Sequence, residues 1–540
     1  MLIYPKYVIL MIYGGVRMIQ LISIIRKGSF IGLALLAIAT LGQAQEVPSR
    51  YADLYDYLQN NLNGYEANLD RLMPMEKRSV VFAAELLAAN GNRGTDLFQP
   101  GVMNSVKLSL DRFQEMGIGG VTLAVGYPLF DPSFPRRDEY VAFFQSVAKE
   151  VRQRGIKLDI ECALAVANTP AATFTWDWSG YTVESLAAAK HAMLEIILAQ
   201  IQPDYLNLGS EPSTDAQLTG IHSLNDPQTY AHFVELQVKG LNKGSTLVGA
   251  GSSAWENITT ASLIADVPEL DTLTFHVYPV DPTSQQNSLE LAAIAQRHGK
   301  RLVLDEAWLH KLLPSEGGGV AMISENLKRD SYSFFAPLDQ QFMRCMAKLA
   351  EVDGVEYLSA FSSNLFFAYL DYSDALDNET YAQVATQLNQ AASKAMKADA
   401  WSSTGDFMKA LIARYVASAE VISTPTAPNG ATSGITNNSC YYSTEGSASN
   451  LGHPVQYLFD WGNGTTSGWL AVGTTIASKS WTSAGSYTVK AQARCATDTS
   501  VVSSWSSGLN VKVGVRLGIL DFDGDGKTDI AVWRPSNGYW

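Results

Sequence analysis

The chain has 540 residues, of which 46% are hydrophobic, as expected for a globular protein with one large domain and a smaller one. It carries 39 Lys and Arg against 53 Asp and Glu, a formal net charge of −14. This acidity argues against nucleic-acid binding, because phosphate backbones are bound by clustered Lys and Arg. A neutral polymer or a small neutral ligand fits the composition better.

The N-terminus has the features of an export signal. Arg26 and Lys27 precede the apolar run 30–41, and small residues stand at the two positions before residue 45 that a signal peptidase recognises. We therefore expect residues 1–44 to be a signal peptide, cleaved after Ala44, and the mature protein to be secreted, at the cell surface or periplasmic. The run is too short for a comfortable membrane span, so no stable span is expected; a retained anchoring helix is the alternative.

Apolar strands then alternate with amphipathic helices, after a first helical segment over residues 51–73. The predicted strands cover residues 79–87, 119–126, 156–165, 205–211, 246–253, 273–278, 302–306 and 355–361, and the predicted helices cover residues 102–116, 138–155, 182–201, 227–242, 260–265, 288–298, 336–352 and 380–417.

About eight strands, each followed by a helix, predict an α/β fold of the (β/α)8 or TIM-barrel type over residues 45–420. An open, doubly wound parallel sheet is the alternative. It is disfavoured because no glycine-rich phosphate loop follows the first strand, as a nucleotide-binding sheet would need.

The composition changes near residue 421. Residues 421–430 are rich in Pro and Thr and predict a linker, and residues 431–514 contain the short alternating segments of a small all-β sandwich. Two stretches there, DWGNG at 460–464 and GSYTV at 485–489, resemble the PKD family of immunoglobulin-like modules. The resemblance implies a spacer or binding appendage of an exported protein.

The four cysteines have different expected roles. Cys162, in a predicted strand, and Cys345, in a predicted helix, are expected to be buried thiols. Cys440 and Cys495 share the β-rich region and could form one disulfide in an exported protein. No Cys/His spacing suggests a zinc site.

The last segment, residues 515–540, contains the stretch DFDGDGKTD at 521–529. Alternating carboxylates with a glycine at the sixth position are typical of a calcium loop. With IAVW at 530–533, the stretch resembles a single partial FG-GAP or VCBS-type repeat. A lone repeat cannot bury its face, so truncation, packing on a neighbour and a disordered acidic tail are alternatives. The expected ligands of Ca²⁺ are Asp521, Asp523, Asp525, Lys527 and Asp529.

Two glutamates end predicted barrel strands. Glu211 ends the strand 205–211 and is followed by Pro212, and Glu306 ends the strand 302–306. Groups at the C-terminal ends of barrel strands face one mouth. Hydrolysis of a glycosidic bond needs one carboxylic acid and one carboxylate, so these two glutamates are the candidate catalytic pair, and no cofactor is expected for catalysis.

At these motifs the chain resembles clan A glycoside hydrolases, whose acid/base Glu follows strand four, usually as Asn-Glu-Pro, and whose nucleophile Glu ends strand seven. The resemblance implies Glu211 as acid/base, Glu306 as nucleophile and retention of configuration. His276 and Tyr278 match the clan's His-x-Tyr, whose tyrosine hydrogen-bonds the nucleophile. Ser210 stands where the clan usually has the Asn that binds the sugar's 2-hydroxyl, a departure that predicts altered specificity or lost activity.

Further substrate contacts are expected from aromatic and polar residues in loops and at strand ends. Tryptophans offer flat faces for sugar rings, with a place in the core or at the rim as the alternative. The acidic residues could bind hydroxyls or form salt bridges. These candidates are Trp176, Trp178, Trp255, Trp308, Glu85, Glu161 and, in the fourth strand, Asn207.

We therefore expect a secreted, monomeric, retaining β-glycoside hydrolase that acts on a polysaccharide or oligosaccharide. The alternative is a barrel that binds glycans without cutting them and is displayed by its β-rich modules. A metal-dependent hydrolase is a weaker third hypothesis, because His276 and His310 lack companion ligands at predicted strand ends.

Overall fold

The computed structural model describes residues 45–515 except 75–78, 317–324, 417–419 and 451–452, together with Lys527 and Asp529. The expected signal peptide, and Asp521, Asp523 and Asp525 of the expected calcium loop, fall outside the described residues. The export signal and the calcium site therefore stay predictions. Among the described helices, none is both long and apolar enough to cross a membrane.

Eight parallel strands close into a barrel in which each strand pairs with the next along the chain. Strand β8 pairs with β1 and completes the ring. The predicted TIM barrel is thereby confirmed. The strands are β1 (Val81–Glu85), β2 (Gly120–Ala124), β3 (Lys157–Glu161), β4 (Tyr205–Asn207), β5 (Leu247–Gly251), β6 (Thr272–Val277), β7 (Arg301–Ala307) and β8 (Val355–Ala360).

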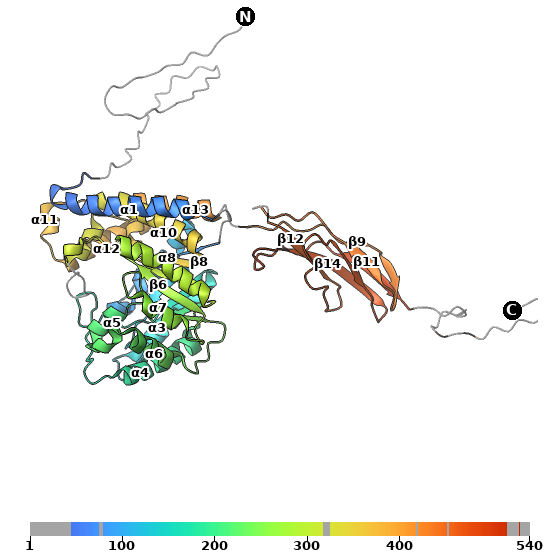
Figure 1. Cartoon of the computed structure of the whole chain (residues 1–540), viewed down its shortest axis with the longest axis horizontal. Helices are drawn as coiled ribbons and strands as arrows, with labels where there is room; N and C mark the ends of the chain where they lie inside the picture. The colour runs from blue at the N-terminus through green and yellow to red at the C-terminus, as the bar shows by residue number, and fades with distance from the viewer. Residues whose placement is uncertain are drawn as a thin grey trace, which may run out of the picture. The chain divides into compact units, whose positions relative to one another are not determined.

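Helices surround the barrel (Figure 1). They bury the apolar residues that recur every three or four positions, as in the second helix, which ends at Gly117 with a left-handed φ of 90°. The helices are α1 (Ala52–Leu72), α2 (Val102–Met116), α3 (Arg137–Gln153), α4 (Val183–Ile196) with a π-helical turn at Ile197–Ile201, α5 (Pro212–Thr219), α6 (Pro227–Val238), α7 (Ile258–Ala265), α8 (Pro282–Arg297), α10 (Ala336–Asp353), α11 (Asp374–Asp377), α12 (Tyr381–Lys397) and α13 (Ser403–Val416).

Four of these helices differ from the sequence-based expectation, which did not include the short helix α11. The single helix predicted over 380–417 is two helices, α12 and α13, separated where Asp399 adopts a left-handed φ of 54°. Helix α5 was not predicted. Pro212 is its first residue, a position where the missing N–H has no partner to lose and the fixed φ suits a helix.

Helix α1 packs along α10 and α8 as part of the barrel unit (Figure 1). Leu58, Leu62 and Tyr65 are buried there, and the Tyr65 hydroxyl hydrogen-bonds the Ser288 hydroxyl. On the same helix, the Glu66 carboxylate accepts hydrogen bonds from Arg344 and Lys348. The residues before the first strand are therefore integral to the barrel's core.

After the barrel, the chain forms two further sheets, with strand orders β10-β15-β14-β12 and β13-β11-β9. Residues from both sheets, among them Tyr442, Phe459, Trp481 and Val511, share one buried apolar cluster. A small all-β region after the barrel is thus confirmed. Its strands are β9 (Asn429–Gly430), β10 (Ser433–Ile435), β11 (Cys440–Ser443), β12 (Val455–Asp460), β13 (Ile476–Lys479), β14 (Gly485–Cys495) and β15 (Leu509–Gly514).

The disulfide expected between Cys440 and Cys495 is not formed, and both thiols are free. The Cys440 sulfur lies against Gly434 of β10. Gly434 and Gly485, the first residue of β14, both pair with Val513, so Cys440 lies near the start of β14. Cys495 is the last residue of that strand, about 33 Å away at 3.3 Å per residue. The buried thiols expected at Cys162 and Cys345 are confirmed.

Candidate active site

The loop after β4 presents Glu211. Strand β4 ends at Asn207, earlier than predicted, and backbone hydrogen bonds to β5 continue through the loop, from Leu208 N to the Gly249 oxygen and from Gly251 N to the Gly209 oxygen. Gly209 adopts a φ of 134°, which only glycine takes readily. Glu211 then caps the N-terminus of α5. The acid therefore stands on an ordered loop rather than at the end of the strand itself.

An irregularity between β6 and β7 places two adjacent acids in the barrel interior. Phe275 pairs with Leu304, but the next residue, His276, pairs with Glu306, so Asp305 has no partner on β6. In a regular strand successive side chains point to opposite faces. The extra residue removes this alternation, and both Asp305 and Glu306 reach the ring of His276.

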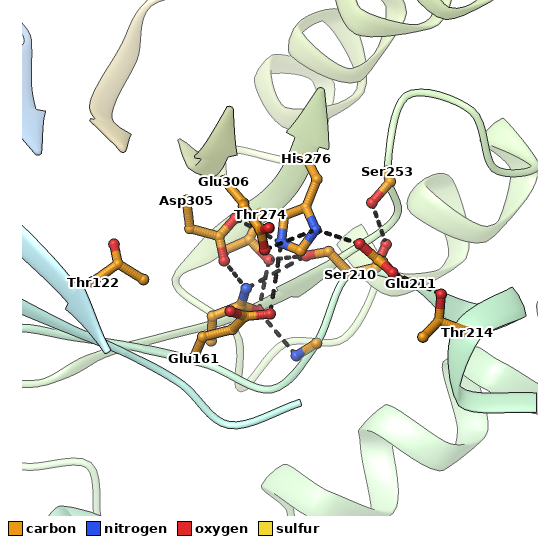
Figure 2. Close-up of polar contacts among 12 residues, drawn as sticks. Thr122, Glu161, Ser210, Glu211, Thr214, Ser253, Thr274, His276, Asp305 and Glu306 are labelled. Atoms are coloured by element: carbon orange, nitrogen blue, oxygen red, sulfur yellow. Dashed lines mark hydrogen bonds and ion pairs between the residues drawn. The ribbon is translucent and has the colours of Figure 1, made fainter. Parts of the chain in front are cut away.

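His276 lies at the centre of the carboxylates (Figure 2). Its Nδ1 atom is 2.8 Å from the Glu211 Oε1 and 3.7 Å from the Glu306 Oε2. Its Nε2 atom is 3.6 Å from the Asp305 Oδ1 and 3.8 Å from the Glu161 Oε1, distances of ion pairs rather than of hydrogen bonds. One imidazole ring thus faces four acids delivered by β3, β7 and the loop after β4.

A polar layer supports this cluster from within the barrel. The Asn207 amide nitrogen donates to Asp305, and its amide oxygen accepts from the Thr274 hydroxyl at 2.9 Å and from Gly209 N at 3.0 Å. The Ser210 hydroxyl bonds the Thr274 hydroxyl at 2.9 Å. Asn207 therefore acts through Asp305 and the loop, and the structure does not place it in contact with the cavity.

A cavity of about 800 Å³ opens above the cluster. Its volume lies in the range of ligand sites. Besides loop and helix residues, it is lined by six of the site residues predicted from the sequence. These are Glu161, Ser210, Glu211, Tyr278, Glu306 and Trp308.

The other singled-out residues do not line this cavity. Trp255 stacks on the Tyr278 ring with centroids 4.4 Å apart, so it orients a cavity residue from behind. The ring centroids of Trp176 and Trp178 lie 6.2 and 6.3 Å from the ring centroid of Tyr127, so both tryptophans belong to an aromatic cluster around Tyr127. Glu85 is buried and accepts a hydrogen bond from Asn90.

Burial and mutual charge shift the protonation of the cluster. Burial opposes the charged form of His276, but the carboxylates of Asp305 and Glu306 outweigh it and raise the pKa of His276 well above its ordinary value. This shift favours the imidazolium form of His276 at neutral pH. Burial also raises the pKa of Glu161 to about 7, despite the nearby His276.

The two candidate catalytic acids are shifted in opposite directions. Burial would raise the pKa of Glu211, but the hydrogen bond and the charge of His276 outweigh it and lower that pKa below its ordinary value. For Glu306, burial together with the charges of Glu161 and Glu211 outweighs His276 and raises the pKa well above its ordinary value. In the unliganded site the proton thus resides on Glu306, the reverse of the order that an acid Glu211 and a nucleophile Glu306 would show.

Three side chains in the barrel lie close enough together to be considered as metal ligands. Donor atoms of Glu161, His276 and Glu306 all lie within 4.8 Å of one another, so His276 does have companions, contrary to the sequence-based expectation. The two glutamates, however, lie nearest to different nitrogens of the ring, Glu161 to Nε2 and Glu306 to Nδ1, so neither ring nitrogen faces both carboxylates. The trio fits a histidine shared between carboxylates better than a metal site.

The shifted pKa of Glu85 gives a stability prediction. Burial, reinforced by Glu161, raises the pKa of Glu85 to about 8 from 4.5, so the folded state binds a proton that the unfolded state has lost between these pH values. Stability should therefore fall as pH rises from 4.5 to 8. We expect Glu85→Gln to leave stability unchanged near pH 4 and to raise it by about 3–5 kcal/mol at pH 8.5, as measured by urea denaturation.

Glu66→Gln is the matched comparison with the opposite sign. The hydrogen bond from Arg344 lowers the pKa of Glu66 to about 2. The stabilisation of the folded state by ionised Glu66 is therefore present above pH 4.5 and is lost as pH falls toward 2. This variant should be less stable than the unmodified protein at pH 8.5. Equal effects of the two substitutions would contradict the assigned protonation of Glu85.

Fold and site together define a (β/α)8 barrel protein with paired carboxylates at a cavity in the mouth of the barrel. No family model matches the chain, and no curated protein matches it. Among solved structures, it is similar to the exo-β-1,4-mannosidase Op5Man5 from Opitutaceae bacterium strain TAV5, with 15% identity over 67% of this chain and 62% of that one and a TM-score of 0.40.

Two further solved structures are similar to parts of the chain. A GH5_18 protein from Bifidobacterium longum subsp. longum ATCC 55813 has 11% identity over 66% of this chain and 82% of that one, with a TM-score of 0.44. The PKD domain of an M14-like peptidase from Thermoplasmatales archaeon SCGC AB-540-F20 has 26% identity over 17% of this chain and 95% of that one, with a TM-score of 0.15. Likenesses at this level carry no inference on activity, so function is inferred below from the site's own residues.

Proposed function

We propose that this protein is an exported, retaining β-glycoside hydrolase that cleaves a polysaccharide or oligosaccharide by double displacement, with Glu211 and Glu306 as the carboxyl pair. The observation that carries the proposal is the convergence of both acids on His276 Nδ1, at 2.8 and 3.7 Å, on the wall of one cavity. These distances put the Glu211 Oε1 and the Glu306 Oε2 at most about 6.5 Å apart, a bound compatible with the about 5–5.5 Å between the carboxyl groups of retaining enzymes.

His276 offers a route to the reactive protonation state. The unliganded site favours a carboxylate at Glu211 and a protonated Glu306, whereas the reaction needs the reverse. His276 can give its Nδ1 proton to Glu211 and then accept the proton of Glu306 at the same nitrogen, after a small approach of that side chain. The imidazolium is restored, and one proton has moved from the nucleophile to the acid.

The chemical steps then follow from the geometry. The Glu306 carboxylate attacks the anomeric carbon while the bond to the leaving oxygen breaks and that oxygen takes the proton of Glu211. Glu211 next removes a proton from water, whose oxygen displaces Glu306 from the sugar. The buried carboxylates around the cavity stabilise the positive charge that develops on the sugar ring. The Tyr278 hydroxyl, 3.3 Å from His276 Nδ1, helps to orient the ring.

The experiment is a screen for reducing-sugar release on a broad panel of polysaccharides and oligosaccharides. The unmodified protein should release sugar from at least one of them. Glu211→Gln and Glu306→Gln should each lose about 10²-fold or more of this activity. Glu290→Gln is the matched control, because Glu290 is a partly exposed residue of α8 that pairs with Arg297 and does not line the cavity. Activity that survives both site substitutions would contradict the proposal.

A glycan-binding barrel without hydrolysis is the second candidate. It is favoured by Ser210, whose hydroxyl is buried and bonded to Thr274, so that the expected contact to the sugar's 2-hydroxyl lacks its usual donor. Binding to a polysaccharide on the same panel, with no sugar released by the unmodified protein, would select this function.

A further inference from the structure

Three residues from separate segments of the C-terminal module meet outside the barrel. Glu420 lies two residues before Ile422, which pairs with Ser449; His453 lies two residues before β12, and Cys495 ends β14. Val455 pairs with Cys495 across the sheet, which brings the start of β12 to the end of β14. The three side chains therefore come together through folding, and their sequence spacing gives no sign of it.

Their donor atoms are spaced like ligands of one metal ion. The His453 Nδ1 is 3.6 Å from the Cys495 Sγ and 3.0 Å from the Glu420 Oε1, and all three atoms lie within 4.8 Å of one another. Around a tetrahedral Zn²⁺, bonds of about 2.3 Å to sulfur and about 2.0–2.1 Å to nitrogen and oxygen give edges of about 3.6 Å from S to N and about 3.3 Å from N to O. The observed edges agree with these values to within a few tenths of an ångström.

The surroundings of the sulfur suit a metal thiolate. The Cys495 Sγ accepts hydrogen bonds from the backbone N–H groups of Thr497 at 3.2 Å and Asp498 at 3.1 Å. Such outer contacts hold a ligating sulfur in place. Cys495 is fully buried and free of any disulfide, and the side chains of Glu420 and His453 are 7% and 13% exposed.

We propose that Glu420, His453 and Cys495 bind one zinc ion that fastens the leading segment of the module to β12 and β14. Cysteine, histidine and glutamate are ligands that zinc accepts together, and water can complete the tetrahedron. On binding, the thiol proton is released to solvent and His453 binds through its unprotonated Nδ1 with its proton on Nε2. The site lies in the module, so it is independent of the function proposed for the barrel.

The test uses the full chain, freed of metal with a chelator and titrated with Co²⁺ or Zn²⁺. We expect one ion per chain with a Kd of about 1 µM or tighter, and with Co²⁺ the thiolate-to-metal charge-transfer band of a tetrahedral sulfur site. Cys495→Ser should abolish the band and weaken zinc binding by at least about 100-fold. Cys440→Ser is the matched control, a free cysteine of the same module, and should bind like the unmodified chain.

Glu420→Gln covers the case in which Cys495→Ser does not fold, because it keeps a hydrogen-bonding side chain and removes only the carboxylate ligand. It should keep the charge-transfer band and bind zinc more weakly, and zinc should raise the melting temperature of the unmodified chain more than that of this variant. Zinc bound without the sulfur band, or bound equally by the Cys495→Ser chain, would place the ion elsewhere and overturn the proposal. Absence of zinc binding by the unmodified chain would also overturn it.

Discussion

Glu306→Ala is expected to lower kcat by at least about 10⁴-fold, because the proposed mechanism uses the Glu306 carboxylate to form the covalent intermediate. Azide should restore turnover, since the small anion fits the space vacated by the side chain and attacks from the same side of the sugar. The product should be a glycosyl azide of inverted configuration, as identified by NMR.

Glu211→Ala should behave differently. Loss of the general acid and base should lower kcat by about 10²–10⁴-fold, least for substrates with a good leaving group. The glycosyl intermediate on Glu306 still forms, and azide then attacks it from the other face, so the azide product should retain its configuration. If the two variants give each other's products, the roles are exchanged, as the protonation of the unliganded site would favour. Glu290→Ala should need no rescue.

The second large effect is expected for His276→Gln. The imidazolium holds the pKa of Glu211 low against burial, so its loss should let that pKa rise while Glu306 stays protonated. A larger share of the molecules would then carry protons on both acids and lack the carboxylate that the proposed mechanism needs. We expect kcat to fall by about 10²–10³-fold at pH 7 and the acidic limb of the profile of kcat/KM against pH to move to higher pH, with partial recovery of activity in alkaline solution.

The pH profile separates this positioning role from a structural one. A variant damaged only in its packing would lose activity by the same factor at every pH. His298→Gln is the matched control, because His298 also forms an ion pair, with Asp266 at 3.0 Å, but at the end of α8. An unmoved acidic limb in His276→Gln would mean that His276 does not set the protonation of Glu211.

The sequence predicted the barrel well because its signal is repeated many times. Each predicted strand lies within a few residues of an observed one, since buried parallel strands are short apolar runs bounded by turns. The convergence of Glu211 and Glu306 on one cavity followed from the same pattern, because strand ends of a closed parallel barrel share one mouth.

Other parts of the site depend on contacts that periodicity does not encode. Asp305 was missed because regular alternation places it on the face opposite to Glu306, and only the extra residue in β7 turns both inward. The central position of His276 was likewise missed, since it depends on four acids from three segments. Trp176 and Trp178 resembled sugar platforms in sequence, but side-chain packing with Tyr127 decides where they lie.

The C-terminal module shows the same limit. The disulfide between Cys440 and Cys495 was a reasonable inference from composition, and it was wrong because strand register puts the two residues at opposite ends of β14. The absence of a Cys/His spacing gave no hint of the cluster at Glu420, His453 and Cys495, since strand pairing assembles it from distant segments.

The extra residue of β7 also affects how relatives of this barrel should be aligned. A sequence whose seventh strand pairs regularly would be one residue shorter there, and an ungapped alignment would set its terminal acid against Asp305 instead of Glu306. A relative with such a regular strand should be aligned with a single-residue gap at this place, and its strand-end acid should be assigned by its pairing with the His276 position. An alignment scored on hydrophobicity alone would place the counterpart of Glu306 one residue away.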